Sequence, residues 1–528
     1  MSKQARIKRS WTCNRQRLSC KSFSIEKSPR LRLRLKLYLQ GGSILNHLNR
    51  LFDSILGRQS APADSADGES DASSNSTGEK TAEASKADQS DKKNRNSTAL
   101  IEIAAVGILT AAAAHVLSHS VGWLGSLRLQ LSQSEHRAWL LPLFGLLGGV
   151  LCGVIVRYIA PEITGSGIPQ VKGFLRGHKI PMNLRSMIAK LVAGILALGC
   201  GLPLGREGPT VQIGASLSGM FVSLLSSGEK VKRQFVAAGA GAGLAAAFNA
   251  PLAGVIFVVE ELVKEVSSSF VITAGLACFA AASMSQLLGN HSLDLSSHSD
   301  FPICHFQFED IPYLFILGIV CGALGSFFNW LIIVGMKWRV KVFKNNYPLS
   351  IGIAGLICGC TVALLPQSMH NIAGIKYLII AHNPTLEFAG TALAISFLIT
   401  IISYISGAPG GLFGPSLTIG CAAGYMLGAT EMGEWANASN APDLFALAGM
   451  GAFFSAVARV PITATVIVFE ITRDFNLLLP LLMTTMVAYT VGERIYSGSL
   501  YDRLLDLSAT EKPAEGRQPD AQPPASQP

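Results

Sequence analysis

The sequence is poor in charged residues and rich in long apolar runs. Only 15% of its 528 residues are Asp, Glu, Lys or Arg, and 49% are hydrophobic. Soluble domains carry roughly 25% charged residues, so this composition excludes an ordinary soluble protein and predicts an integral membrane protein. The apolar runs also lack the alternation that a membrane barrel requires, so the membrane segments are expected to be helices.

The sequence also lacks cysteines at metal-binding spacing, and it lacks a strongly basic folded domain. The ten cysteines are scattered, mostly within apolar runs, and no cysteine spacing matches a metal site. We therefore expect no metal and no cofactor. The net charge of +9 does not indicate nucleic-acid binding, because residues 1–50 hold 13 Lys and Arg and one acid, which leaves about −3 for the rest.

Composition divides the chain into four parts. Residues 1–58 form a basic tail in which residues 30–37 alternate basic and apolar side chains. This pattern suits contact with anionic lipid, and it also suits an unordered tail. Residues 59–98 are rich in Ser, Asp and Ala and predict a disordered linker. The membrane domain is expected at 99–507, followed by a disordered tail at 508–528.

The membrane domain contains an internal repeat. Aligning Pro251 with Pro461, at an offset of 210, brings seven further identities into register. Upstream, Gly205–Pro209 aligns with Gly411–Pro415 at an offset of 206. Two matches in the same order predict two structural halves with a binding site where their broken helices meet. The predicted halves are residues 99–300 and 305–507.

An arginine and a glutamate stand side by side in Gly205-Arg206-Glu207-Gly208-Pro209. Charged groups at membrane depth are costly and are retained where an ion binds or passes. Pro209 suits the first turn of a helix, and the free N–H groups of that turn attract an anion. The motif therefore predicts a helix N-terminus that faces an anion, with the Glu207 carboxylate competing for the same place.

Two other Gly-rich turns resemble this one, Gly165-Ser166-Gly167-Ile168-Pro169 and Gly410-Gly411-Leu412-Phe413-Gly414-Pro415. A helix N-terminus offers unpaired N–H donors and a positive partial charge of about half an elementary charge. Such donors hold a chloride-like anion without trapping it, as a full counter-charge would. The three turns together predict one chloride site, to which the Ser166 hydroxyl adds a donor.

In this order, the three motifs resemble the signature set of the CLC chloride channel/transporter family, and the resemblance covers about residues 99–507. It implies an all-α polytopic membrane protein with an inverted-repeat fold of broken, partly spanning helices, working as a homodimer with one pore per subunit. Because only 27 residues follow Tyr501, the chain resembles bacterial-type members without C-terminal CBS domains. This would place it in the inner membrane, and its basic loops suggest a cytoplasmic N-terminus.

The resemblance also implies roles for individual residues. The central chloride would be held by the Ser166 hydroxyl, the Leu412 and Phe413 amides and the tyrosine that closes the inner side. That tyrosine matches Tyr501, with Tyr496 as the nearby alternative. The outer chloride site would be lined by the amides of Arg206, Glu207 and Gly208.

Proton coupling requires carboxylates, and the resemblance implies two. Glu207 would be the gating glutamate and Glu261 the internal proton-transfer residue, while neighbouring Glu260 matches Glu470 in the repeat and is expected to be structural. Lys190 matches an intramembrane lysine of the family and would add positive potential to the pore. The chain departs from the common pattern at two positions, where Gln170 and Lys172 replace acids found in many or some members.

Three functions follow from these residues. A chloride/proton antiporter is favoured because Glu207 and Glu261 are both present. A passive voltage-gated chloride channel of the same fold is the alternative. An intramembrane enzyme with Ser166 as nucleophile would need a base, and no histidine lies in the apolar runs near the motifs, so we expect no enzyme. The expected partners are chloride, protons, membrane lipid and a second copy of the chain.

Overall fold

A computed structural model describes part of the chain. The described residues are 77–132, 138–224, 228–289, 306–382, 384–430 and 441–511. The predicted basic tail, the predicted linker up to residue 76 and the C-terminal tail from residue 512 lie outside this part. The chain divides into two units, Met1–Ser85 and Lys86–Pro528. Within the first unit, the described residues 77–85 are helical.

Helices extend beyond both predicted ends of the membrane domain. The first, α3, runs over Thr77–Ser132, so residues 77–98 of the predicted linker are helical. The last, α20, runs over Leu500–Glu511 and includes the first residues of the predicted C-terminal tail. The predicted limits at residues 98 and 508 therefore lie inside helices.

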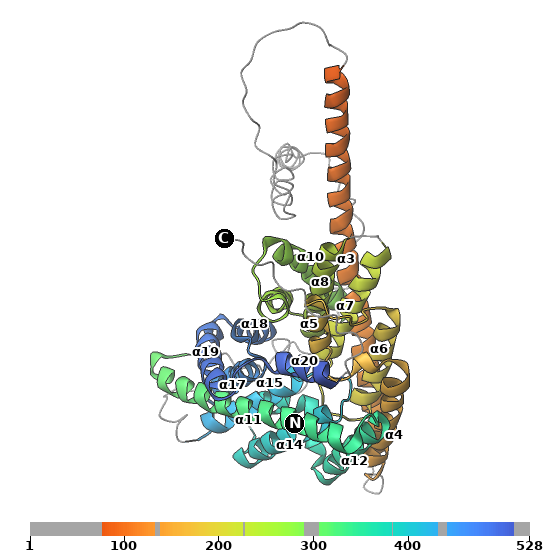
Figure 1. The fold of residues 1–528 in the computed structure, drawn as a ribbon. Helices are drawn as coiled ribbons and strands as arrows, with labels where there is room; N and C mark the ends of the chain where they lie inside the picture. Colours follow the sequence, from red (N-terminus) through yellow and green to blue (C-terminus); the bar gives the residue numbers. More distant parts are fainter. Residues whose placement is uncertain are drawn as a thin grey trace, which may run out of the picture. The chain divides into compact units, whose positions relative to one another are not determined.

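The described residues form helices joined by short turns, and they contain no strand (Figure 1). In chain order between α3 and α20, the α-helices are α4 (Leu140–Val154), α5 (Ile168–Leu175), α6 (Leu184–Gly199), α7 (Glu207–Leu224), α8 (Glu229–Phe248), α9 (Pro251–Phe257), α10 (Ser268–Leu287), α11 (Ile311–Phe343), α12 (Tyr347–Leu364), α13 (Ile375–His382), α14 (Leu386–Ile405), α15 (Phe413–Gly428), α17 (Ala441–Ala458), α18 (Pro461–Thr472) and α19 (Leu478–Ile495). Two π-helical segments continue α4 and α9, namely η2 (Ile155–Ile159) and η4 (Val258–Val263).

Within the described part of the chain, seven helical segments are long and apolar enough to cross a membrane. They are Leu100–Gln130, Leu140–Ile159, Phe270–Leu287, Phe308–Phe343, Tyr347–Leu364, Leu386–Ile405 and Phe475–Ile495. Other helices, such as α5 and α9, are too short to span a bilayer. The fold is therefore an all-α polytopic membrane protein with broken, partly spanning helices, as the sequence predicts.

The helix breaks fall where the proline pattern predicts them. Helix α8 ends at Phe248, Asn249 adopts a left-handed conformation with φ of 56°, and α9 begins at Pro251. The second half repeats this break, because Arg459 has φ of 62° and α18 begins at Pro461. Proline suits the first helical turn because it has no N–H to leave unpaired. The shared break confirms the repeat seen in the sequence.

Glycine contacts between helices are also repeated in the two halves. A Cβ on Gly214 of α7 would collide with the carbonyl oxygen of Gly239 in α8. The repeat-related pair, Gly420 of α15 and Gly449 of α17, has the same contact. Membrane helices approach this closely only through small residues. Each half therefore holds its motif-bearing helix, α7 or α15, against a glycine-rich partner.

The two halves cap each other's helices through a reciprocal pair of glutamates. The Glu260 carboxylate accepts hydrogen bonds from the Ile462 and Thr463 amides at the start of α18, at 3.1 and 2.7 Å. Its repeat partner Glu470 accepts from the Leu252 and Ala253 amides at the start of α9, at 3.0 and 2.8 Å. The structure thus confirms that Glu260 has a structural place, as the repeat predicts.

We expect Glu260→Ala and Glu470→Ala each to lower the free energy of unfolding by about 1–2 kcal/mol, because each leaves two amides of a helix N-terminus without their acceptor. Unfolding of the purified protein in detergent, followed by circular dichroism, measures the change. Glu265→Ala, at an exposed position, is the control. Equal stability of Glu260→Ala and the control would contradict the capping role.

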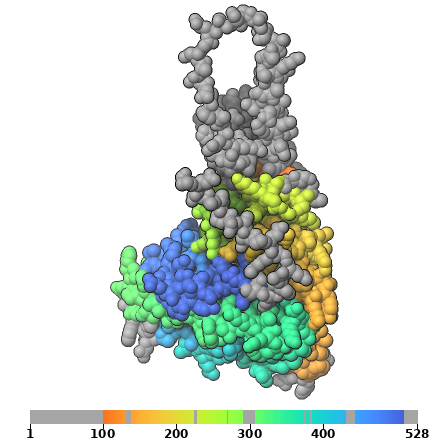
Figure 2. Space-filling model, viewed as in Figure 1, coloured from red at the N-terminus to blue at the C-terminus, as the bar shows by residue number. Residues whose placement is uncertain are grey.

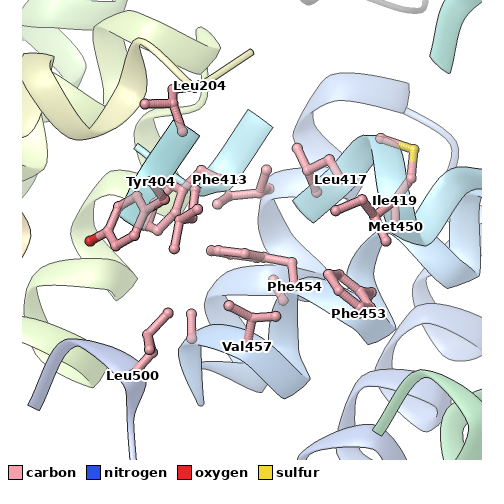
Figure 3. Packing of buried hydrophobic residues seen from close by; sticks show 14 of the residues in the cluster. Leu204, Tyr404, Phe413, Leu417, Ile419, Met450, Phe453, Phe454, Val457 and Leu500 are labelled. Carbon is pink, nitrogen blue, oxygen red and sulfur yellow. The ribbon is translucent and has the colours of Figure 1, made fainter. Parts of the chain in front are cut away.

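An aromatic cluster lies at the start of α15. The Phe413 ring meets the Phe454 ring edge-on with 4.5 Å between centroids, and the Phe257 ring at 5.7 Å. Figure 3 shows Phe413 and Phe454 of this cluster and the Tyr404 hydroxyl pointing away from them. Because Phe257 belongs to α9 in the first half, the cluster joins both halves behind the motif turns. On the face seen in Figure 2, the C-terminal helices (blue) lie next to α11 (green), which packs against α19.

Candidate functional site

The three Gly-rich turns meet at one place. The Gly205 amide donates to the Gly411 carbonyl at 2.7 Å, and the Gly411 amide donates back to the Gly205 carbonyl at 2.6 Å. The Gly410 amide donates to the Gly165 carbonyl at 3.1 Å. The repeat-related motifs therefore pair with each other directly, and the third turn joins them. The convergence predicted from the sequence is confirmed.

Gly208 lies at the centre of this junction. A Cβ on Gly208 would stand 2.6 Å from the Ser166 carbonyl oxygen and 2.8 Å from the Gly411 Cα. Both distances are far below van der Waals contact, and both involve backbone atoms that cannot rotate away. Only glycine allows the three turns to approach in this way.

We therefore expect Gly208→Ala to force the turns apart and to reduce chloride flux by at least about tenfold, since an ion site tolerates little displacement of its donors. Chloride efflux from proteoliposomes measures the loss. Gly275→Ala is the matched control, because a Cβ there meets nothing within 4 Å. Normal flux through a folded Gly208→Ala protein would show that the close approach is dispensable.

The Ser166 turn is held by a buried lysine and lies beside a buried tyrosine. The Ser166 hydroxyl accepts from the Ile168 amide at 3.3 Å, where α5 begins. The Lys190 amine, fully buried, donates to the carbonyls of Ile163 and Gly165 at 2.8 and 2.7 Å. The Tyr404 hydroxyl lies within hydrogen-bonding reach of Ser166. The structure thus places Lys190 as a brace for this turn, with its charge close to the predicted chloride site.

Glu207 lies at the N-terminus of α7. It is the first residue of α7, yet both of its carboxylate oxygens lie 3.4 Å from where a Gly414 Cβ would stand, at the start of α15. The carboxylate is buried, and its Oε2 has no hydrogen-bond partner among the described residues. A carboxylate in this position faces the positive end of α15, where an anion is expected to bind. Arg206, beside it, is half-buried.

Leu412 and Phe413 form the start of α15. Leu412 precedes Phe413, the first helical residue, so the amides of both belong to the unpaired first turn of the helix. Both side chains are fully buried. Tyr501 is also fully buried, and its ring lies 6.2 Å from the Phe413 ring. Its hydroxyl has no hydrogen-bond partner among the described residues.

The alternative tyrosine lies in a different environment. Tyr496 directly follows α19, and its ring is covered by the Arg503 guanidinium at 3.8 Å. Of the two candidates, Tyr501 is the one in contact with the aromatic cluster at the start of α15.

A buried ion cluster contains the second predicted carboxylate. Glu261 is fully buried, and its Oε1 accepts from the Lys172 amine at 2.6 Å and from the Ser499 hydroxyl at 3.0 Å. The same Lys172 amine lies 2.7 Å from an oxygen of Asp502. The Ser499 hydroxyl also accepts from the Tyr501 amide at 3.3 Å. Glu261 is therefore linked through one serine to the backbone of Tyr501.

Asp502 connects this cluster to water. It pairs with Arg176 at 2.6 Å and with Lys264 at 2.7 Å. The exposed fraction rises from 1% at Glu261 to 21% at Asp502 and 48% at Lys264. Burial opposes ionisation of Asp502, but its hydrogen bonds with Lys172 and Lys264 outweigh burial and lower its pKa to about 2. Asp502 is thus ionised at neutral pH and provides an ionic partner for Lys172.

Sequence reasoning missed several residues of this site. Tyr404 lies next to Ser166, and the only signal for it is a tyrosine shortly before Ser406-Gly407-Ala408-Pro409, which extends the third turn backward. Asp502 follows the predicted Tyr501 directly, but its three cationic partners are distant in sequence. In the sequence Lys172 stands out only as a departure from the family pattern, and nothing there indicates its partner Glu261.

These features define a class of protein: a polytopic membrane protein whose broken helices meet, N-terminus to N-terminus, around a buried carboxylate. A family model described as voltage gated chloride channel matches residues 148–493, about two thirds of the chain. The chain belongs to this family, the CLC family.

Relatives of this chain carry names that describe ion exchange. It is 33% identical over 424 residues to the H(+)/Cl(-) exchange transporter ClcA of Vibrio parahaemolyticus, covering 77% of this chain and 89% of that protein. It is 31% identical over 433 residues to the protein of the same name from Cronobacter sakazakii, covering 79% and 91%.

Solved structures of similar fold include two antiporters. The crystal structure of a slow cyanobacterial Cl-/H+ antiporter matches with a TM-score of 0.72 and 28% identity, covering 78% of this chain and 98% of that chain. A CLC-type fluoride/proton antiporter matches with a TM-score of 0.65 and 21% identity, covering 76% and 97%, which shows the fold alone.

Proposed function

We propose that this protein exchanges chloride for protons across a membrane. The observation that carries the proposal is the position of the Glu207 carboxylate against the start of α15, where a chloride ion would bind. When ionised, this side chain competes with chloride for the same place. When protonated, it loses the attraction to the helix N-terminus and leaves the place to chloride. The exchange activity named for the relatives supports the same conclusion.

The chloride site is assigned to the meeting point of the turns. The Ser166 hydroxyl and the Leu412 and Phe413 amides act as its donors, and the unpartnered Tyr501 hydroxyl is the fourth. The amides of Arg206, Glu207 and Gly208 line a second place for chloride on the Glu207 side.

Lys190 supports the chloride site from behind. Its two hydrogen bonds orient the Gly165–Ser166 turn, and its charge raises the potential at the site. Because the amine is turned toward the carbonyl oxygens, it attracts chloride without contacting it.

Protons enter the protein on the other side through Glu261. This carboxylate is buried beside Tyr501, and Asp502 joins it to exposed Arg176 and Lys264. A carboxylate shielded from water holds a proton more readily than an exposed one. Glu261 therefore receives protons at the charged cluster and passes them toward Glu207.

The orientation of the protein in the membrane and its cellular location are assigned from its charges and its relatives. The cluster side carries Lys172, Arg176 and Lys264 beside Lys230 and Arg233, and basic loops face the cytoplasm in most membrane proteins. We place this side and the N-terminus in the cytoplasm of a bacterial cell, with the protein in the inner membrane as a homodimer. The relatives are named as exchange transporters, which supports transport rather than enzymatic catalysis.

Reconstitution tests exchange against the alternative, a passive channel. Purified protein is placed in liposomes with an imposed chloride gradient and no pH gradient, and the external pH is recorded. Exchange moves protons uphill as chloride flows down its gradient. A chloride flux that leaves the pH unchanged while the membrane potential is clamped with K⁺ and valinomycin would establish a passive channel.

A further inference from the structure

A cavity of about 450 Å³ lies beside the ion cluster, and no residue of the three Gly-rich turns lines it. We call it the basic cavity and define it by Arg176, Lys230, Arg233, Lys264 and Phe270, which are among its lining residues. They come from the end of α5, the start of α8, the turn after η4 and the start of α10. Segment η4 packs against all three helices and so holds the walls of the cavity together.

The lining of the basic cavity is strongly cationic. Four of its residues are cations, and Glu265 is the only acid among the described residues that line it. Two of the cations, Arg176 and Lys264, share the carboxylate of Asp502. The other two pair with no carboxylate among the described residues. Two positive charges are therefore left without a counter-charge, which favours a ligand that carries two negative charges.

Packing brings these cations together from different helices. A Cβ on Gly177 would stand 3.4 Å from a terminal nitrogen of the Arg233 guanidinium, so Arg233 of α8 lies against the end of α5, next to Arg176. The Lys232 amine lies 5.8 Å from the centre of the Phe174 ring, which also ties the start of α8 to α5. Like charges held close together repel each other unless an anion lies between them. Guanidinium and ammonium groups are the usual protein ligands of phosphate.

The basic cavity lies at the end of a membrane-crossing segment. Phe270 is the first residue of the apolar segment Phe270–Leu287, and Leu175 and Leu262 also line the cavity. Val266, close to it in the sequence, is 86% exposed. A soluble phosphate would leave this apolar wall uncovered, whereas a phospholipid places its phosphate among the cations and its chains beside the wall. Basic pockets between membrane helices bind the headgroups of multiply charged lipids in this way.

The basic cavity is connected to the proton-transfer residue through shared cations. Arg176 and Lys264 line the cavity and also pair with Asp502, which in turn pairs with Lys172, the ionic partner of Glu261. A phosphate in the cavity offers Arg176 and Lys264 a second anion, so they hold Asp502 less strongly. Asp502 then attracts Lys172 more strongly and draws it away from Glu261. A carboxylate that loses its cationic partner accepts a proton more readily.

We infer that the basic cavity binds the headgroup of a doubly anionic phospholipid, with its phosphates on Lys230 and Arg233, and that the bound headgroup makes Glu261 easier to protonate. The lipid thereby speeds proton entry into the exchange cycle. This second part rests on the proposed exchange function. The binding itself does not rest on it, because lipid binding can be measured without transport.

Native mass spectrometry of the purified full-length protein tests the binding. The protein in detergent is incubated with cardiolipin, a doubly anionic phospholipid, or with zwitterionic phosphatidylcholine. We expect cardiolipin to stay bound and phosphatidylcholine to be lost. The double variant Lys230→Gln with Arg233→Gln is expected to bind cardiolipin at least about tenfold more weakly, since each cation near a membrane surface strengthens the attraction by about fivefold. Lys179→Gln with Lys341→Gln is the matched control, because these two exposed lysines do not line the cavity.

Three outcomes would overturn the binding. One is equal retention of cardiolipin and phosphatidylcholine. Another is equal cardiolipin affinity of the cavity variant and the control variant when both have the unfolding temperature of the parent protein. The third comes from glycerol 3-phosphate, which carries a phosphate but no apolar chain. If it bound as tightly as cardiolipin, the ligand would be a soluble phosphate ester and not a lipid.

Proton movement in liposomes tests the link to Glu261. Chloride-driven proton movement is recorded in phosphatidylcholine liposomes with and without cardiolipin. We expect cardiolipin to speed proton movement in the parent protein at least about twofold more than in the Lys230→Gln with Arg233→Gln variant, each relative to its own rate without cardiolipin. An equal change in both proteins would refute the link, because it would reflect the surface charge of the membrane alone. Absence of proton movement in every liposome would instead contradict the exchange proposal and leave the lipid-binding result standing.

Discussion

Glu207→Ala is expected to abolish proton movement driven by a chloride gradient and to preserve chloride flux. In the proposed mechanism, the Glu207 carboxylate, which lies against the start of α15, both competes with chloride there and carries the proton. Removing it leaves the donors of the Ser166 and Phe413 turns in place, so chloride still binds. The proton has no acceptor on that side, so coupling is lost completely. Simultaneous recording of chloride and pH in liposomes measures both fluxes.

Glu229→Ala is the matched control for this variant, because Glu229 is exposed at the start of α8. It is expected to keep both fluxes. If Glu207→Ala retained full proton transport, Glu207 would not be the gate. If it lost chloride flux while remaining folded, the side chain would be part of the chloride site instead of its competitor.

Glu261→Gln is expected to have a similarly large effect through a different step. The amide can still accept hydrogen bonds from Lys172 and Ser499, and Lys172 keeps Asp502 as its ionic partner at 2.7 Å. The fold of the cluster is therefore preserved while the titratable group is removed. Proton movement should fall to the background of empty liposomes, and chloride flux should remain.

The adjacent Glu260 provides the control for Glu261. Its carboxylate caps α18 and does not contact the ion cluster. Glu260→Gln is expected to keep proton movement although it loses stability. Loss of proton transport in both variants alike would mean that the effect comes from disturbed structure, and normal proton transport in Glu261→Gln would exclude Glu261 from the proton route.

Much of the fold could be predicted from glycine and proline spacing. The offset of 210 between Pro251 and Pro461 predicted equal helix breaks, and Asn249 and Arg459 both show them. Local backbone requirements explain this success, because proline suits the first turn of a helix and so marks where the second helix of each pair begins. The offset of 206 likewise predicted that Gly205 and Gly411 belong to one site.

The ion cluster could not be predicted in the same way. Lys172 and Glu261 are 89 positions apart, and Asp502 lies in another helix. No periodicity or local motif joins such residues, because only the packing of α5 against η4 and α20 brings them together. Tyr404 was likewise not predicted, because its contact with Ser166 depends on the packing of segments that are far apart in the sequence. The functional roles of Ser166, Glu207, Glu261 and Tyr501 remain predictions from the family resemblance, which their positions support.

Proton uptake on chloride binding tests the central claim, that chloride and the ionised Glu207 carboxylate compete for one place. Chloride is added to purified protein in a weakly buffered detergent solution, and the pH is recorded. Competition predicts that chloride displaces the carboxylate into a position that favours protonation, so the solution becomes more alkaline, and by linkage lower pH strengthens chloride binding by the same factor. Glu207→Gln is predicted to bind chloride without proton uptake. Equal proton uptake by Glu207→Gln and the parent protein would contradict the account.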